Sequence, residues 1–340
     1  MIIINERNVN GALRQGIDFL LNYGIREQSR NGEVLVAKHP VCTQYIIPCE
    51  RVVFSPTRDA NPFFHFFESL WMLAGRNDVA YVAEFVKRMR EFSDDGKTMH
   101  GAYGHRWRAS FGYDQLETIV EELKSNPQSR RCVLAMWDGS CHASAMDDLH
   151  VGVSGGKDVP CNTHAYFDVR NNALNMTVCN RSNDIIWGAY GANAVHFSML
   201  QEYIARKVGV EVGVYRQFSN NYHTYTWQNS EDKLRTIAAE CEVCDIYSED
   251  YAAAKPYPLM QTSGKLWDLD LEHFMENFGL PINYSDPFFS HVVYPMSRAW
   301  LMLKEDTEYA LHYCNVTAAK DWCIACAAWI KRRDQKENAA

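Results

Sequence analysis

Residues 158–193 read DVPCNTHAYFDVRNNALNMTVCNRSNDIIWGAYGAN. Apolar and polar side chains alternate over 166–169 and again over 173–178, a period of two that is typical of half-buried strands. The Arg-Asn-Asn sequence between them predicts a tight turn. The resulting hairpin would place Cys161 at the mouth of one strand and Arg181 at the far end of the next. We therefore expect a thiol and a fixed cation beside one pocket.

The composition indicates an ordinary globular protein. The chain has 340 residues, of which 47% are hydrophobic and 22% charged, and its net charge is −8. An acidic chain has no global basic field for a nucleic-acid backbone, so small substrates are favoured. The N-terminus lacks the features of a signal peptide, and no apolar run reaches the roughly 18 residues that span a bilayer. We expect a cytoplasmic protein that binds neither nucleic acid nor membrane.

The eleven cysteines are interpreted as reduced thiols, mostly small buried hydrophobes. CxxC spacing at Cys241/Cys244 and at Cys323/Cys326 is compatible with a zinc-stabilised binding module. Both pairs lie in helix-like sequence, far apart and without turn residues between the thiols. Ordinary core or surface thiols are therefore favoured, and no metal site is predicted.

Helical and strand-like periodicity alternate along the chain. A long polar loop is expected over 138–157, and mainly helical sequence over 231–340, including 306–333. The predicted helices are 10–23, 62–74, 81–92, 114–125 and 194–208, and the predicted strands outside the hairpin are 33–37, 132–137 and 211–218.

A few polar residues stand out within these elements. Glu68 lies in a strongly apolar helix, either on its exposed edge or in a pocket where burial would raise its pKa. Arg130 and Arg131 stand together at a strand entrance, as a phosphate-binding pair or as a solvated turn. His223 and Tyr225 alternate onto one face of a strand.

Short motifs follow one another in a specific order. They are SRNG (29–32), ESLWMLAG (68–75), YGHRWR (103–108), SRR (129–131) with Trp137, PC (160–161), RSND (181–184), Asn193 and HTY (223–225). This order resembles thymidylate synthases and the related pyrimidine-nucleotide hydroxymethylases. The resemblance implies an α+β fold, a large mixed and antiparallel sheet flanked by helices. It also implies a single domain over 1–340, with a family core at about 24–230 and a helix-rich C-terminal extension at about 231–340.

The resemblance also implies a covalent mechanism. A thiolate that adds to C6 of a pyrimidine makes C5 able to attack a one-carbon donor. Cys161 matches that nucleophile and Glu68 the carboxylate that organises proton transfer and water at the base, while Tyr103 and Asn162 complete the expected catalytic set. A free thiol needs roughly 2 kcal/mol of local stabilisation to be mostly thiolate at pH 7, and Arg181 is positioned to supply it.

The expected phosphate site draws on two subunits. A nucleotide phosphate suits a cluster of arginines. The matching residues are Arg30, Arg181 and Ser182 of one subunit, together with Arg130 and Arg131 of its partner. A homodimer is therefore implied.

The remaining matched positions are expected to contact the sugar, the base and the folate. His223 and Tyr225 match residues that hold the sugar hydroxyl, and Asn193 matches the amide that reads the pyrimidine edge. Asp184 is expected to contact both the nucleotide and the folate. The implied cosubstrate is 5,10-methylenetetrahydrofolate, and its other expected contacts are Trp71, Met89 and Phe92.

Departures from the synthase pattern favour the hydroxymethylase branch. Asn162 stands where synthases carry histidine, and Asn221 replaces an aspartate. Met89 and Phe92 stand where synthases usually have tryptophans, and the loop 188–193 is one residue longer. The C-terminal sequence does not resemble the short synthase tail that closes over the folate. We therefore predict that water, rather than hydride, completes the reaction.

Alternative functions remain open from the sequence. An asparagine amide can donate to O4 and accept from N3–H of uracil, so Asn193 favours dUMP over dCMP or CMP. A thymidylate synthase that makes dTMP and releases dihydrofolate is the main alternative. A cysteine hydrolase built on Cys161 would leave the arginines and the Asn193 loop unexplained.

Overall fold

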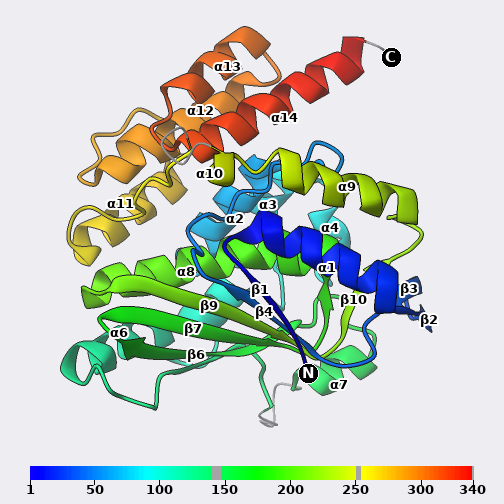
Figure 1. Cartoon of the computed structure of the whole chain (residues 1–340). Coiled ribbons are helices and arrows are strands. Elements are labelled where there is room, and N and C mark those ends of the chain that lie inside the picture. The colour runs from blue at the N-terminus through cyan, green and yellow to red at the C-terminus, as the bar shows by residue number, and fades with distance from the viewer. Residues whose placement is uncertain (140–146, 250–253, 339–340) are drawn as a thin grey trace.

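The computed structural model describes residues 1–139, 147–249 and 254–338 of the chain. It contains two sheets, several helices packed on the larger sheet, and a C-terminal group of helices beyond them (Figure 1). The expected α+β fold with a mixed sheet and a helix-rich C-terminal region is confirmed.

The larger sheet has six strands in the order β1-β4-β9-β7-β6-β5. Their bounds are β1 Ile2–Glu6, β4 Val41–Tyr45, β9 Glu211–Ser219, β7 Ala173–Asn180, β6 Asn162–Arg170 and β5 Val133–Ala135. The smaller sheet has four strands in the order β2-β3-β10-β8. Their bounds are β2 Ile25–Ser29, β3 Gly32–Val36, β10 Tyr222–Tyr225 and β8 Asn183–Asp184.

The predicted hairpin of β6 and β7 is confirmed, and its strands are longer than their alternating cores. The turn residues Asn171 and Asn172 have φ values of 51° and 59°. Two positive φ values are the requirement of the tight hairpin turn that matches strand twist, and asparagine tolerates them well. Asn162 pairs with Asn180 at the other end of the hairpin, which places Cys161 and Arg181 side by side.

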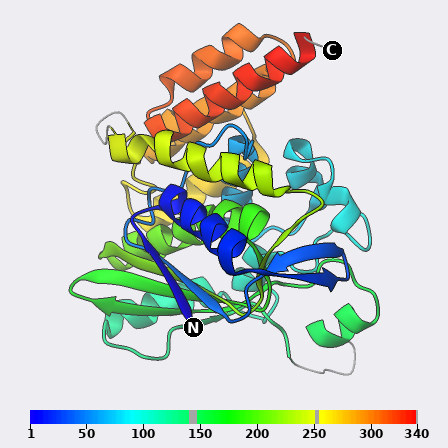
Figure 2. The ribbon, with the colours of Figure 1, turned by 45° about the vertical axis from the view of Figure 1, so that its right-hand side comes forward.

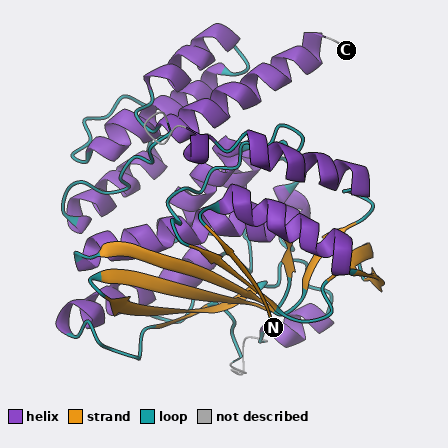
Figure 3. Ribbon diagram, in the orientation of Figure 1, coloured by secondary structure: helices purple, strands orange, loops and turns teal. Residues whose placement is uncertain are grey.

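Helices cover one face of the large sheet (Figure 3). The central one, α8 (Asn193–Val208), is buried at every position from Asn193 to Ala205 and contacts both β7 and β9. It ends at Gly209, whose φ of 89° favours glycine. It packs against α2 (Pro62–Leu73) and α6 (Gln115–Ser125). Next to these, α5 (Tyr103–Arg108) packs on α2 and α6, and α1 (Val9–Tyr23) packs on β1 and β4.

Two local predictions were wrong. The helix expected over 81–92 is divided into α3 (Val79–Phe85) and α4 (Met89–Phe92), because the backbone at Val86 is extended. The loop expected over 138–157 contains α7 (Asp148–Val153), which Asp147 caps by accepting two backbone N–H groups. Residues 140–146 of that loop lie outside the described residues.

Of the C-terminal helices, α9 packs on α1, and α14 packs on α2 in the layer farthest from the large sheet (Figure 2). Their bounds are α9 Glu231–Val243, α10 Ile246–Glu249, α11 Gly264–Glu276, α12 Tyr294–Met302, α13 Thr307–Val316 and α14 Lys320–Asn338. The Trp322 ring of α14 lies 5.2 Å from Phe66, and the Phe274 ring of α11 lies 6.0 Å from Phe67. Since Phe66 and Phe67 directly precede Glu68 on α2, α11 and α14 complete the core that positions this carboxylate.

Both CxxC pairs lie at helices, Cys241/Cys244 at the end of α9 and Cys323/Cys326 within α14. In the ranges that the structure describes, no group of three or more His, Cys, Asp or Glu side chains is placed to hold a metal ion. No described helix is long and apolar enough to cross a membrane.

The packing of α14 on α2 predicts that a cavity at this contact should lower the stability of the protein. Trp322 is 6% exposed, so Trp322→Ala should lower the free energy of unfolding by about 3–5 kcal/mol through the cavity it leaves. Tyr309→Ala on α13, where the ring is 53% exposed, is the matched control and should cost less than about 1 kcal/mol. Urea titrations followed by circular dichroism measure both, and equal losses would contradict the packing described here.

Candidate active site

The backbone at Cys161 is fixed by a tyrosine. The Tyr103 hydroxyl, at the start of α5, accepts hydrogen bonds from the backbone N–H groups of Cys161 at 2.9 Å and Asn162 at 3.0 Å. Gly104 allows this approach, because a Cβ there would collide with the Met72 backbone of α2. The phenol therefore lies directly beside the nucleophile that the sequence predicts.

Arg181 fixes the same segment from the other strand. Its guanidinium donates from Nε to Pro160 O at 2.8 Å and from Nη2 to Val159 O at 3.0 Å, and its backbone N–H donates to Cys161 O at 2.9 Å. The guanidinium also lies 5.8 Å from the Trp137 ring centre. Arg181 is thus both a structural support of the thiol loop and a charge beside it.

A cavity of about 380 Å³ opens next to the thiol. Most of the residues that the sequence predicts for catalysis, substrate or folate line it. They are Glu68, Trp71, Met89, Phe92, Tyr103, Cys161, Ser182, Asp184, Asn193, His223 and Tyr225. A neighbouring hollow of about 680 Å³ shares Cys161, Ser182, His223 and Tyr225 with it and adds Arg30 and Arg181.

Three predicted residues lie elsewhere. Arg130 and Arg131 are exposed beside β5 and line neither hollow of their own chain. Asn162 is fully buried and lies outside the cavity wall. Its amide donates to Asn193 Oδ1 at 3.1 Å and accepts from Asn180 Nδ2. Asn162 therefore contacts a residue of the cavity wall, Asn193, without lining the cavity itself.

Asn193 is held in one orientation by a chain of amides. Its Nδ2 donates to Asn183 Oδ1 at 3.1 Å, and Asn183 Nδ2 donates to Gln217 Oε1 at 3.0 Å. The turn before α8, η1 (Ile185–Ala192), departs from helical geometry at Gly191, where φ is −121° and ψ is −109°. This departure falls within 188–193, the segment expected from the family resemblance to be one residue longer than in synthases.

Several opposing effects act on the pKa of the Cys161 thiol. Burial raises its pKa; Arg181 and Arg30 lower it, and Asp158 raises it further. The net pKa lies above the ordinary thiol value. Arg181 lowers the pKa as expected, but burial outweighs it, so the expectation that Arg181 would make the thiolate dominant is wrong.

Asp184 and His223 are neighbours on the parallel strands β8 and β10. Asp184 Oδ1 accepts from the backbone of Ile186 at 2.8 Å and of Trp187 at 2.6 Å. Burial raises the pKa of Asp184 and lowers that of His223. Asp184 Oδ2 is buried with no hydrogen-bonding partner among the described residues. This oxygen is therefore an acceptor that a bound ligand could satisfy.

Sequence reasoning missed several residues of the cavity wall, among them Trp187 and His196. Trp187 is 51% exposed and its ring lies 6.1 Å from Phe64, so the two rings form one aromatic wall. His196 lies one helical turn after Asn193 on α8. The i, i+3 spacing from Asn193 is the only sequence signal that could have indicated it.

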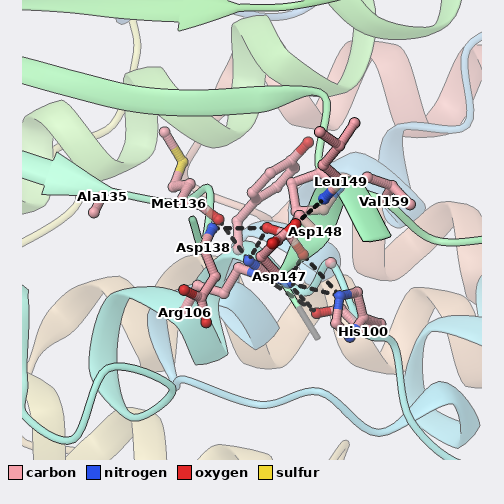
Figure 4. Close-up of polar contacts among 12 residues, drawn as sticks. His100, Arg106, Ala135, Met136, Asp138, Asp147, Asp148, Leu149 and Val159 are labelled. Atoms are coloured by element: carbon pink, nitrogen blue, oxygen red, sulfur yellow. Dashed lines mark hydrogen bonds and ion pairs between the residues drawn. The ribbon is translucent and has the colours of Figure 1, made fainter. Parts of the chain in front are cut away.

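A buried ion-pair cluster anchors α5, the helix that carries Tyr103 (Figure 4). Arg106 donates to both oxygens of Asp148, at 2.7 and 2.9 Å, and His100 Nε2 lies 2.8 Å from the same carboxylate. Burial acts to raise the pKa of Asp148, but the hydrogen bonds from His100 and Arg106 hold it at about 2. The cluster joins α5 to α7 and to Asp138, whose N–H also donates to Asp148.

Comparison with known proteins places the chain among enzymes of pyrimidine metabolism. The thymidylate synthase family model matches residues 16–243. The chain is 48% identical to the deoxyuridylate hydroxymethyltransferase of Pseudomonas phage M6, over 98% of this chain and 95% of that protein. It is 37% identical to the protein of the same name from Bacillus phage SP01, over 58% of this chain and 54% of that one.

A more distant match is to a putative thymidylate synthase of Methanothermobacter marburgensis, 36% identical over 42% of this chain and 58% of that protein. The similarity along nearly the whole chain is thus to the hydroxymethylase branch. With the family core matched and the cysteine cavity formed, the chain belongs to the thymidylate synthase family and is a one-carbon transferase.

Proposed function

We propose that the protein is a deoxyuridylate 5-hydroxymethylase, which converts dUMP, 5,10-methylenetetrahydrofolate and water to 5-hydroxymethyl-dUMP and tetrahydrofolate. The observation that carries this proposal is a single cavity that presents the Cys161 thiol, the Asn193 amide and the unpaired Asp184 carboxylate oxygen. The names of the two phage relatives support the same reaction.

The cavity is suited to a folate beside the nucleotide. Asp184 Oδ2 is an acceptor without a donor, and the N–H groups of a flat heterocycle would satisfy it. Trp71 and the Phe64–Trp187 wall offer flat apolar surfaces for such a ring. The folate would supply the one-carbon unit, and Cys161 would activate the pyrimidine by adding to C6.

The orientation of Asn193 supports uracil as the base. Its Oδ1 accepts one hydrogen bond from Asn162, and its Nδ2 donates one to Asn183. One lone pair and one N–H remain, which match N3–H and O4 of uracil. Reading cytosine would require the amide to turn over and break both internal hydrogen bonds.

The phosphate site supports a homodimer. Arg30, Arg181 and Ser182 line one hollow, whereas Arg130 and Arg131 lie outside it on the same chain. The face of the large sheet opposite α8 carries exposed apolar side chains, including Ile3 (65%), Val133 (45%) and Tyr166 (46%). A second copy packed on that face would cover them and would carry its own arginines toward this hollow.

The cavity walls support water rather than hydride as the final reactant. Among the residues that the structure describes, none beyond Tyr225 lines the cavity, so the C-terminal helices do not close over it. Met89 and Phe92 line the side where synthases usually carry tryptophans. Water therefore has access to the reacting carbon.

The folate product distinguishes the two reactions. Purified protein with dUMP and methylenetetrahydrofolate should form 5-hydroxymethyl-dUMP without the absorbance rise of dihydrofolate, and Cys161→Ala should bind dUMP but lose all turnover. Parallel assays with dCMP and CMP test the base. Dihydrofolate formed in step with product, or turnover of dCMP or CMP but not dUMP, would contradict the proposal.

The charges around Cys161 predict how its reactivity depends on pH. Because the thiol pKa is raised, alkylation of Cys161 should increase with pH and reach half its maximum above the free-thiol value of about 8.5. Asp158→Asn should lower this midpoint and Arg30→Gln should raise it, since each removes one nearby charge. Peptide-resolved mass spectrometry after iodoacetamide treatment measures the rates. Shifts of the opposite sign would refute this electrostatic account.

Subunit mixing tests the donated arginines. A variant with Arg130→Ala and Arg131→Ala should be nearly inactive, as should Cys161→Ala. A mixture allowed to exchange subunits should recover about one quarter of wild-type activity, because half the dimers are mixed and each holds one complete site. If both arginines served their own subunit, no activity would return.

A further inference from the structure

A carboxylate and an imidazole meet in the wall of the cavity. Glu68 Oε2 on α2 lies 3.1 Å from His196 Nε2 on α8. The two side chains are only 12% and 4% exposed, and both line the cavity that holds Cys161. The family resemblance assigns Glu68, but it assigns no role to His196.

The pair has unused hydrogen-bonding capacity. The approach of Glu68 Oε2 to His196 Nε2 lacks the geometry of a hydrogen bond, and neither atom has another partner among the described residues. Buried polar atoms are costly without partners, and much of the nearby wall is apolar, including Trp71 and Met72. A water molecule held between the pair and the cavity would satisfy both atoms.

His65 is the other imidazole close to His196, but it is not the partner of Glu68 in the cavity wall. The His65 ring stands perpendicular to that of His196, with centres 6.5 Å apart, and His65 does not line the cavity. Burial, and then the nearby Arg58, lower the pKa of His65 well below its usual value. His65 is therefore a neutral packing neighbour.

We propose that His196 is a positioning residue for water addition: together with Glu68 it holds the water molecule that attacks the pyrimidine-bound methylene. This inference rests on the proposed function. His196 acts through the water and Glu68, and it contributes specificity for water over other nucleophiles.

The step balances without another reactant. In the covalent adduct, Cys161 Sγ is bonded to C6 and the pyrimidine carries a C5=CH₂ group. The water oxygen bonds to the CH₂ carbon, the double-bond electrons move to the C4 carbonyl as an enolate, and Glu68 accepts the proton. The enolate then re-forms the carbonyl and the C5=C6 double bond as the C6–S bond breaks, which returns Cys161 as thiolate.

Competition between water and an added thiol tests this role. The wild-type protein and its variants are incubated with dUMP, methylenetetrahydrofolate and 2-mercaptoethanol, which also adds to the CH₂ carbon and gives a thioether. The ratio of thioether to hydroxymethyl product is measured by chromatography. This product ratio does not depend on the fraction of a variant that is folded.

His196→Leu should raise this ratio at least about tenfold, because water is no longer held. His196→Gln keeps an N–H donor and should give an intermediate ratio. Ser198→Ala is the matched control, since Ser198 is equally buried on α8 but lies outside the cavity and donates only to Val195 O. It should give the wild-type ratio.

The outcomes separate the inference from the proposed function. If the wild-type protein makes hydroxymethyl product and His196→Leu keeps the wild-type ratio, His196 has only a structural role and the inference fails alone. If Ser198→Ala changes the ratio as much as His196→Leu, the effect is general to α8 and the inference is likewise overturned. If the wild-type protein makes no hydroxymethyl product, the proposed function fails and the inference with it.

Discussion

The hydrogen bonds that Tyr103 and Arg181 make to the backbone of residues 159–162 are the constraint on which the site depends. They come from two separate elements, one from α5 and one from the residue that follows β7, so the thiol loop has little freedom. The buried Arg106–Asp148 pair anchors α5 in turn, and the β6–β7 hairpin sets the position of Arg181. A nucleophile fixed in this way costs little further ordering when substrate binds.

The packing of α2 against α8 is the second constraint, because these helices carry the groups that face the base. Asn193 and His196 lie one turn apart on α8, and Glu68 faces His196 from α2. The C-terminal helices fill the far side of α2 with aromatic contacts. They stabilise the helix that positions Glu68, and none of their described residues lines the cavity.

The sequence predicted the elements whose signals are local. The β6–β7 hairpin was predicted correctly because its signals, the strand alternation and two asparagines that tolerate positive φ, all lie within one segment. In the smaller sheet, β3 and the strand that carries His223 and Tyr225 were predicted, but β2 and β8 were missed. β8 is only two residues long and pairs with β10 far along the chain. His196 was missed because its helical spacing is that of a core residue, and Glu68 meets it only through tertiary packing. Burial of Cys161, which reverses the expected direction of its pKa, is likewise a tertiary property.

The central claim is that solvent water completes a reaction begun by Cys161. Turnover in water enriched in oxygen-18, followed by mass spectrometry of the nucleotide product, tests it most directly. The account predicts a hydroxymethyl product that carries the heavy oxygen on its C5 substituent. A methylated nucleotide without added oxygen would contradict the account.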